Sequence, residues 1–407
     1  MMDRRSQHGF PAKRIDITGF LNHCWTEGWF DEYSNDHFLI KAIEDRVSDL
    51  EWKTQMISNN SLSIFSPINE NGAVDFSQFS QVFVMNISEC LSTMSMCFSE
   101  EKISAFIQNQ LSAGKTHYDE NMFFQALSEI EILDFYCSRF PAKSAVYEPR
   151  LGVGQANPEA SVRAMFPCDQ GEDFEIKVNI EVKTPRFPSL DECHDRSAIS
   201  TVLLNEGRDK FQQLCESHGV MCVFPRVNKL VEFINSASKK FQEPKENEYN
   251  LLYINWSYSD FPSNSFLEAW SLLTNDFNGL LTHREIGPKL HLSEPLNPEA
   301  FSKITAIIVY TSSLDQLMFT DFRYVWQGTN PDVGQRFRMF VLDEKLRDAE
   351  ISCNSKVLFT ITGMRPSILE PKSWKLLFNR NRNSNTIDDQ LFCRQALDII
   401  NEYPLTF

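Results

Sequence analysis

Within residues 174–184, FEIKVNIEVKT, apolar and polar side chains alternate without interruption from Phe174 to Lys183. A strand has a side-chain period of two, so this pattern predicts a β-strand with one apolar and one polar face. The apolar face carries Ile176, Val178, Ile180 and Val182, and the polar face carries Asn179, Glu181 and Lys183. The chain must therefore build a sheet and cover its apolar face with helices or a second sheet.

The segments on both sides of this strand predict an α/β core, which we assign to residues 116–260. A long helix is expected over 119–140, where apolar residues recur at helical spacing before a proline. Short aromatic and β-branched runs predict strands. The further elements expected are strands 144–149, 159–166 and 250–259, and helices near 198–217 and 226–242, with the short segment 221–225 between the two helices.

The regions that flank the core differ from it. Residues 1–115 are expected to be mainly helical, and residues 261–407 are expected to form a mixed α/β extension. The helical segments expected near the N-terminus are 42–60, 76–98 and 101–114. In the C-terminal extension, strands are expected at 303–312 and 356–364, and a closing helix at 389–403.

Composition limits the classes of protein to which this chain can belong. Its 407 residues are 42% hydrophobic, so it can bury a large core and is too apolar to be disordered. Its net charge of -16 is opposite in sign to that of the basic proteins that bind nucleic acid through clustered Lys and Arg. The ten scattered cysteines, with neither a signal peptide nor a membrane-spanning apolar run, predict a cytoplasmic protein outside the membrane.

Glu181 and Lys183 lie together near the end of the central strand. An incidental ion pair on a strand surface is one interpretation. A second carboxylate changes the chemistry, because a regular hairpin centred near Gln170 places Glu159 opposite Glu181, with about 5 Å between Cβ atoms. Two opposed carboxylates repel each other unless a cation neutralises them, and hard oxygen ligands suit Mg²⁺ or Mn²⁺. Asp173 is a rival ligand, but an extended strand puts it roughly 26 Å from Glu181.

These residues resemble the PD-(D/E)XK nuclease superfamily. Pro158-Glu159 and Glu181-Val182-Lys183 match its motif, over about a third of the chain. The resemblance implies a restriction-endonuclease-like core, in which a helix is followed by a three-stranded meander, a second helix and a fourth strand. It also implies that Glu159, Glu181 and Lys183 are catalytic, that Glu159 and Glu181 hold Mg²⁺ or Mn²⁺, and that Lys183 assists the attacking water.

The first and second helices of this family often add residues to the site. On the first helix the candidates are Glu129 and Glu131, and Glu129 lies nearer the apolar stripe, so we predict Glu129 as a third metal ligand. On the second helix, Gln213 and Gln242 are alternatives. The buried stripe expected on the first helix is Ala126, Ile130, Leu133 and Cys137.

The function expected from the resemblance is a metal-dependent nuclease that acts on DNA, in defence against foreign DNA. Lys375, Arg380 and Arg382, interleaved with aromatic residues, are the candidate nucleic-acid-binding residues. Glu159 departs from the family's usual Asp, and this keeps open a decayed nuclease fold that acts as a binding or scaffold protein. The acidic charge predicts weak unaided DNA binding or a basic partner subunit. A protein partner or a homo-oligomer is the assembly expected.

Overall fold

The structure, a computed structural model, divides the chain into two compact units. The first unit comprises residues 1–147, 160–175 and 314–330, and the second comprises 148–159, 176–313 and 331–407. The described residues are 19–44, 76–115, 117–139, 142–151, 157–166, 173–185, 196–200, 205–223, 226–257, 265–275, 279–282, 294–312, 337–342, 357–358, 361–362, 376–380 and 387–403.

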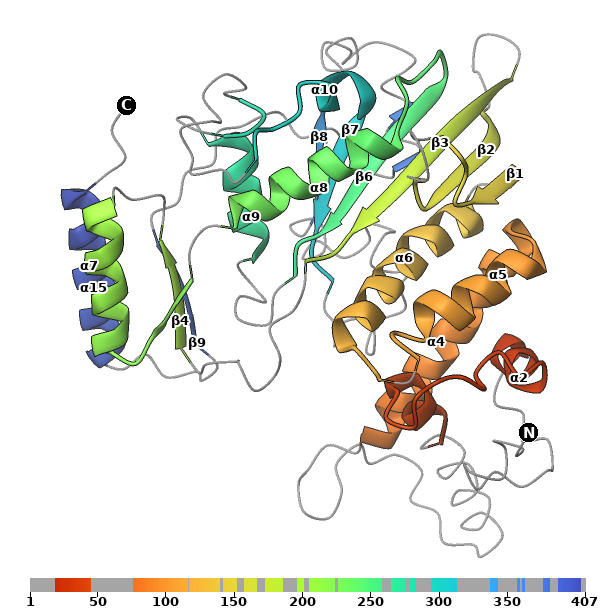
Figure 1. Ribbon diagram of the computed structural model, residues 1–407, viewed down its shortest axis with the longest axis horizontal. Coiled ribbons are helices and arrows are strands. Elements are labelled where there is room, and N and C mark those ends of the chain that lie inside the picture. Colours follow the sequence, from red (N-terminus) through yellow and green to blue (C-terminus); the bar gives the residue numbers. More distant parts are fainter. Residues whose placement is uncertain are drawn as a thin grey trace, which may run out of the picture. The chain divides into compact units, whose positions relative to one another are not determined.

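A mixed six-stranded sheet, with strand order β1-β2-β3-β6-β7-β8, confirms the α/β class (Figure 1). Its strands are β1 (Ala142–Tyr147), β2 (Ala160–Phe166), β3 (Phe174–Lys183), β6 (Glu248–Asn255), β7 (Ala306–Tyr310) and β8 (Phe337–Val341). Strands β3, β6 and β7 are parallel, while β1 runs antiparallel to β2 and β8 antiparallel to β7. Parallel strands are covered on both faces, which explains the almost continuous apolar sequences of β6 and β7.

Helices α8 (Val227–Lys240) and α9 (Ser265–Thr274) cover one face of β6 and β7 (Figure 1). Leu230, Ile234 and Ala237 recur at helical spacing on α8 and are buried against this face. Trp256, which follows β6, is fully buried in the same cluster. The apolar stripe of α8 fixes which of its side chains face β3, and so places the end of the helix beside the polar residues of that strand.

The first unit is mainly helical among its described residues. Its helices are α2 (Gly19–Thr26), α4 (Phe76–Cys97), α5 (Glu100–Phe106), the π-helical turn η1 (Ile107–Leu111) and α6 (Glu120–Arg139). The helices expected at 76–98 and 119–140 are confirmed by α4 and α6, whereas most of the segment 42–60 lies outside the described residues. Helix α6 is buried on nearly every side from Phe123 to Tyr136, as expected of a core helix.

A separate three-stranded sheet, with strand order β5-β4-β9, corrects one part of the sequence prediction. The helix expected near 198–217 begins only at Asn205, because residues 196–200 form strand β4. Strand β4 pairs with β9 (Leu376–Arg380), which local sequence patterns do not reveal. The third strand of this sheet is β5 (Met221–Val223). Helices α7 (Asn205–Ser217) and α15 (Ile387–Glu402) pack with it, and α15 confirms the expected closing helix.

The strand expected over 356–364 is wrong at its described positions, which are helical at residues 357–358 and 361–362. The Thr362 hydroxyl donates to the carbonyl oxygen of Leu358 at 2.7 Å, a contact typical of a helical turn. A short apolar run fits a buried helix as well as a buried strand, so the sequence pattern alone does not separate them. Among the described residues, no helix combines the length and apolar character needed to cross a membrane.

Candidate functional site

Glu181 and Lys183 are the last two polar-face residues of β3, in the stretch that pairs with β6. Ile180 and Val182 are fully buried, as expected for the apolar face of this strand. Glu181 is also fully buried, so the polar face of β3 is covered at this end instead of exposed to solvent. A buried carboxylate is costly unless it is paired or hydrogen-bonded, and the geometry around Glu181 shows how it is paired.

Two ammonium groups contact Glu181. The Nζ atom of Lys183 lies 2.6 Å from Glu181 Oε1. The Nζ atom of Lys240, from the last turn of α8, lies 2.8 Å from the same oxygen and 3.1 Å from Oε2. Lys240 Nζ also lies 3.5 Å from Glu159 Oε1, so a single nitrogen contacts both carboxylates. The structure therefore brings Glu159, Glu181 and Lys183 together, and adds Lys240.

A backbone hydrogen bond to Glu148 helps to place Glu159. Glu159 directly precedes β2, and its carbonyl oxygen accepts a hydrogen bond of 2.8 Å from the backbone N–H of Glu148. Glu148 has a φ of 48°, a left-handed conformation that is uncommon for a residue other than glycine. The backbone turn at Glu148 thus fixes the start of β2, and with it the position of the Glu159 carboxylate.

The pKa of Glu159 is raised from 4.5 to about 7. Burial is the main cause, and the negative charge of Glu181 adds to it. The ammonium groups of Lys240 and Lys183 oppose this rise, and Glu148 reinforces it. Glu159 is therefore poised to exchange a proton near neutral pH, as expected of a carboxylate next to a second one.

Replacing Glu159 with glutamine is expected to flatten the pH dependence of stability. The pKa of Glu159 is higher in the folded than in the unfolded protein. Its contribution to the free energy of unfolding is therefore greatest below about pH 4.5, and it falls by about 3 kcal/mol as the pH rises through 7. Urea unfolding of wild type and Glu159→Gln at pH 4.5, 6 and 7.5 measures the difference in slope. Equal slopes in the two proteins would contradict the raised pKa of Glu159.

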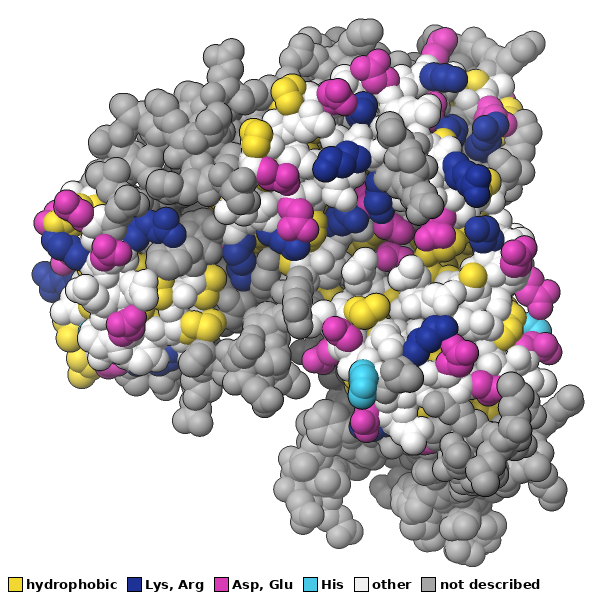
Figure 2. Space-filling model, viewed as in Figure 1, with side chains coloured by type: hydrophobic (Ala, Val, Ile, Leu, Met, Phe, Trp, Pro, Cys, Tyr) yellow, Lys and Arg dark blue, Asp and Glu magenta, His cyan; other side chains and the backbone are white. Residues whose placement is uncertain are grey.

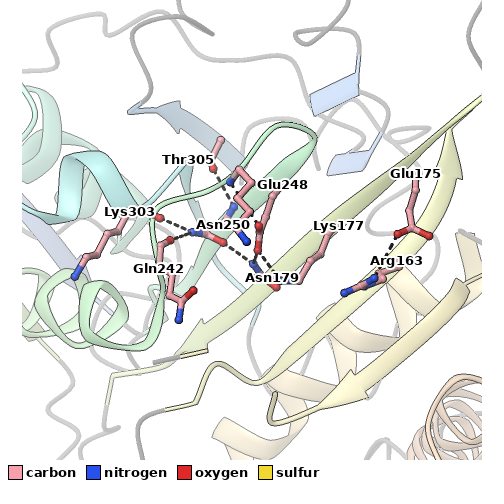
Figure 3. A network of polar contacts seen from close by, with 10 residues as sticks. Arg163, Glu175, Lys177, Asn179, Gln242, Glu248, Asn250, Lys303 and Thr305 are labelled. Atoms are coloured by element: carbon pink, nitrogen blue, oxygen red, sulfur yellow. Dashed lines mark hydrogen bonds and ion pairs between the residues drawn. The ribbon is translucent and has the colours of Figure 1, made fainter. Parts of the chain in front are cut away.

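A buried polar network ties the end of α8 to β3 and β6 (Figure 3). The Asn179 side-chain amide donates to Glu248 Oε1 at 2.8 Å and to Asn250 Oδ1 at 2.7 Å. The Asn250 amide donates in turn to the carbonyl oxygens of Gln242 and Lys303, each at 2.7 Å. Gln242 lies two residues after Lys240, so this network anchors the chain that presents Lys240 to Glu181.

Glu248 of β6 forms a second ion pair, with a lysine of β3. Lys177 Nζ lies 2.6 Å from Glu248 Oε1 across β3 and β6. Burial alone would raise the pKa of Glu248, but hydrogen bonds from Lys177 and Asn179 outweigh it and hold the pKa below its usual value. Glu248 thus stays ionised and fully satisfied, in contrast to the acidic pair of Glu159 and Glu181.

The candidate residues on α6 lie in the first unit. Glu129 and Glu131 are both almost fully buried, so burial does not distinguish between them. Gln125 Nε2 donates to Glu129 Oε1 at 3.5 Å. Within the described part of the chain, no three His, Cys, Asp or Glu side chains lie close enough together to hold a metal ion. The role of Glu129 as a third ligand stays a prediction.

The other predicted residues are placed as follows. Gln213 on α7 and Gln242 after α8 are both exposed, and the side chain from the second helix that reaches the acidic pair is Lys240. Arg380 ends β9, where its backbone pairs with Arg196. The side chain of Arg380, and both Lys375 and Arg382, lie outside the described residues, so the nucleic-acid-binding role of these three stays a prediction.

Lys240 is the residue that sequence reasoning missed. It belongs to a Lys239-Lys240 pair at the end of an amphipathic helix, where basic residues are common because they complement the helix dipole. One usable signal is its position three residues after the buried Ala237, which continues the buried stripe of α8. Its contact with Glu181 depends on the β3–α8–β6 crossover, which spacing alone does not specify.

Comparison of the chain with protein-family models, curated proteins and solved structures found no match in any of the three.

Proposed function

We propose that this protein is a metal-dependent nuclease that hydrolyses phosphodiester bonds, with DNA as substrate. One observation carries the proposal: two buried carboxylates, Glu159 and Glu181, meet beside two ammonium groups at the end of a sheet strand. The resemblance to the PD-(D/E)XK nuclease superfamily supplies the reaction class, and through it a role in defence against foreign DNA.

The donor set fits Mg²⁺ or Mn²⁺. Mg²⁺ keeps several waters and is commonly bound through one or two carboxylates together with substrate phosphates, so two carboxylates meet its need. Glu159 and Glu181 would hold it. When bound, such an ion polarises a phosphoryl oxygen and lowers the pKa of a bound water. The pKa of Glu159 is raised mainly by burial and further by the negative charge of Glu181, which a bound cation would offset.

Lys183 would work on the substrate side of the pair. Its side chain is 16% exposed while that of Glu181 is fully buried, so Lys183 lies between the buried carboxylate and solvent. A positive charge at this place stabilises the charge that develops on the phosphoryl oxygens as water attacks. Glu181 keeps that ammonium fixed at 2.6 Å, which spares the cost of orienting it during the reaction.

The order of elements supports this proposal. Helix α6 is followed by β1, β2 and β3, then by α8 and β6, as in the family's helix, three-stranded meander, second helix and fourth strand. Strand β6 lies parallel to β3 and next to it. In this chain β4, α7 and β5 come between β3 and α8, and this insertion explains why the second helix is hard to identify from the sequence.

A second candidate is a decayed nuclease fold that acts as a binding or scaffold protein. It is favoured by Lys240, whose ammonium contacts both carboxylates and, together with that of Lys183, offsets their charge. On the face shown in Figure 2, acidic side chains lie among the basic ones in the coloured residues. A net charge of -16 also weakens unaided binding to a phosphate backbone, so the nuclease proposal includes a basic protein partner.

Lys183→Ala is expected to lower the cleavage rate roughly a hundredfold, since a positioned proton donor or charge contributes about 10²–10⁴-fold. The assay compares wild type and variant on duplex DNA, single-stranded DNA and RNA, with Mg²⁺, Mn²⁺ or a chelator. Lys177→Ala is the matched control, because it removes another ion-paired lysine from the same strand. Wild type that cleaves none of these substrates favours the second candidate, and equal losses in both variants contradict the role of Lys183.

A further inference from the structure

Lys240 holds a position between carboxylates that a divalent cation would also need. Its Nζ atom contacts both oxygens of Glu181, at 2.8 and 3.1 Å, and one oxygen of Glu159 at 3.5 Å. Lys183 contacts only Glu181 among the two. The two carboxylates are balanced by two ammonium groups, so a divalent ion added to this set would leave an excess of positive charge in a buried place.

The lysine side chain is able to leave this position without a change in fold. Lys240 is 20% exposed and ends helix α8, so its path to solvent is short. Its charge sits on a flexible four-carbon stem, which can reorient while the backbone stays fixed. The backbone itself is held by the hydrogen bond from Asn250 to the Gln242 carbonyl oxygen. A displaced Lys240 ammonium would therefore move outward and leave the carboxylates in place.

We propose that Lys240 is an internal counter-ion of the metal site, which holds Glu159 and Glu181 together until a divalent cation displaces its ammonium. Lys240 is then a positioning residue that sets the affinity for metal, and it is distinct from Lys183, which stays at Glu181. The inference rests on the proposed function in that it takes Glu159 and Glu181 as metal ligands.

Lys240→Gln is expected to bind Mn²⁺ about tenfold more tightly than wild type, because the ion no longer competes with a like charge. Calorimetric titration of Mn²⁺ alone into each full-length protein measures the affinity. Lys239→Gln is the matched control, since Lys239 is the exposed neighbour on the same helix turn, and it should bind as wild type does. Lys240→Arg retains the charge and should also bind close to wild type. A Lys240→Gln protein that binds Mn²⁺ no more tightly than wild type overturns the inference.

A second measurement uses the wild-type protein and does not depend on any variant folding. An amine-acylating reagent, followed by peptide mass spectrometry, reports how accessible each lysine is. Saturating Mn²⁺ should raise the acylation rate of Lys240 several-fold, because its ammonium is released from two carboxylates, and should leave Lys239 unchanged. An unchanged rate at Lys240 overturns the inference.

The two tests separate this inference from the nuclease proposal. Tighter Mn²⁺ binding by Lys240→Gln, in a protein that cleaves no substrate, supports the counter-ion role and removes the nuclease. Cleavage by wild type, with equal Mn²⁺ affinity in Lys240→Gln and wild type, overturns the counter-ion role and retains the nuclease.

Discussion

Glu181→Gln is expected to lower the rate of Mg²⁺-dependent phosphodiester cleavage roughly a thousandfold, since a metal's charge stabilisation is worth several kcal/mol. Glu181 is the fully buried residue that contacts both Lys183 and Lys240. Glutamine keeps the size and shape of the side chain but removes its charge, so it weakens the hold on a cation and releases the Lys183 ammonium from its fixed position. The loss should therefore exceed that of Lys183→Ala.

The matched control for this prediction is Glu248→Gln. Glu248 also forms an ion pair with a lysine of β3, but with Lys177, away from the acidic pair. Its substitution should change cleavage only a few-fold. Steady-state rates of both variants, together with their melting temperatures, separate lost chemistry from lost folding. A Glu181→Gln protein with a wild-type melting temperature that cleaves within tenfold of the wild-type rate would rule out Glu181 as a metal ligand.

The acidic pair illustrates what local sequence can predict. Alternation along β3 places Glu181 and Lys183 on one face, and the register predicted for β2 against β3 places Glu159 near them, since both are consequences of strand geometry over about twenty residues. The ring contact between Phe166 and Phe174, with centroids 5.5 Å apart, fits the same hairpin register. Short-range patterns thus suffice for the part of the site that lies on consecutive strands.

Lys240 and strand β4 illustrate what local sequence does not predict. Lys240 meets Glu181 only because β6 lies parallel to β3 and α8 crosses between them, after an insertion of two strands and a helix. Strand β4 exists because β9, far along the chain, pairs with it. Both depend on contacts between distant segments, which tertiary packing selects over local propensity. The same override makes 357–358 helical in an apolar run that also suits a strand.

Glu268→Ala is expected to destabilise the second unit by about 3–5 kcal/mol, which is the usual cost of removing one partner from a buried ion pair. Glu268 on α9 is fully buried. It accepts hydrogen bonds from the Arg226 backbone N–H at 2.9 Å, from the Arg226 guanidinium and from Trp256 Nε1 at 3.1 Å. Alanine would leave a largely buried guanidinium and a buried indole N–H without their acceptor, and each loss adds to the cost.

Urea unfolding measures this loss, with Glu232→Ala as the control on the neighbouring helix. Glu232 pairs with Lys229 on the exposed side of α8, so its removal should cost less than about 1 kcal/mol. Arg226 directly precedes α8 and Lys240 ends the same helix, so a loosened Arg226 should also disturb the contact of Lys240 with the acidic pair. A Glu268→Ala protein as stable as Glu232→Ala would show that the apolar stripe alone holds α8 in place. The buried ion pair at the other end of the helix would then have no part in positioning Lys240.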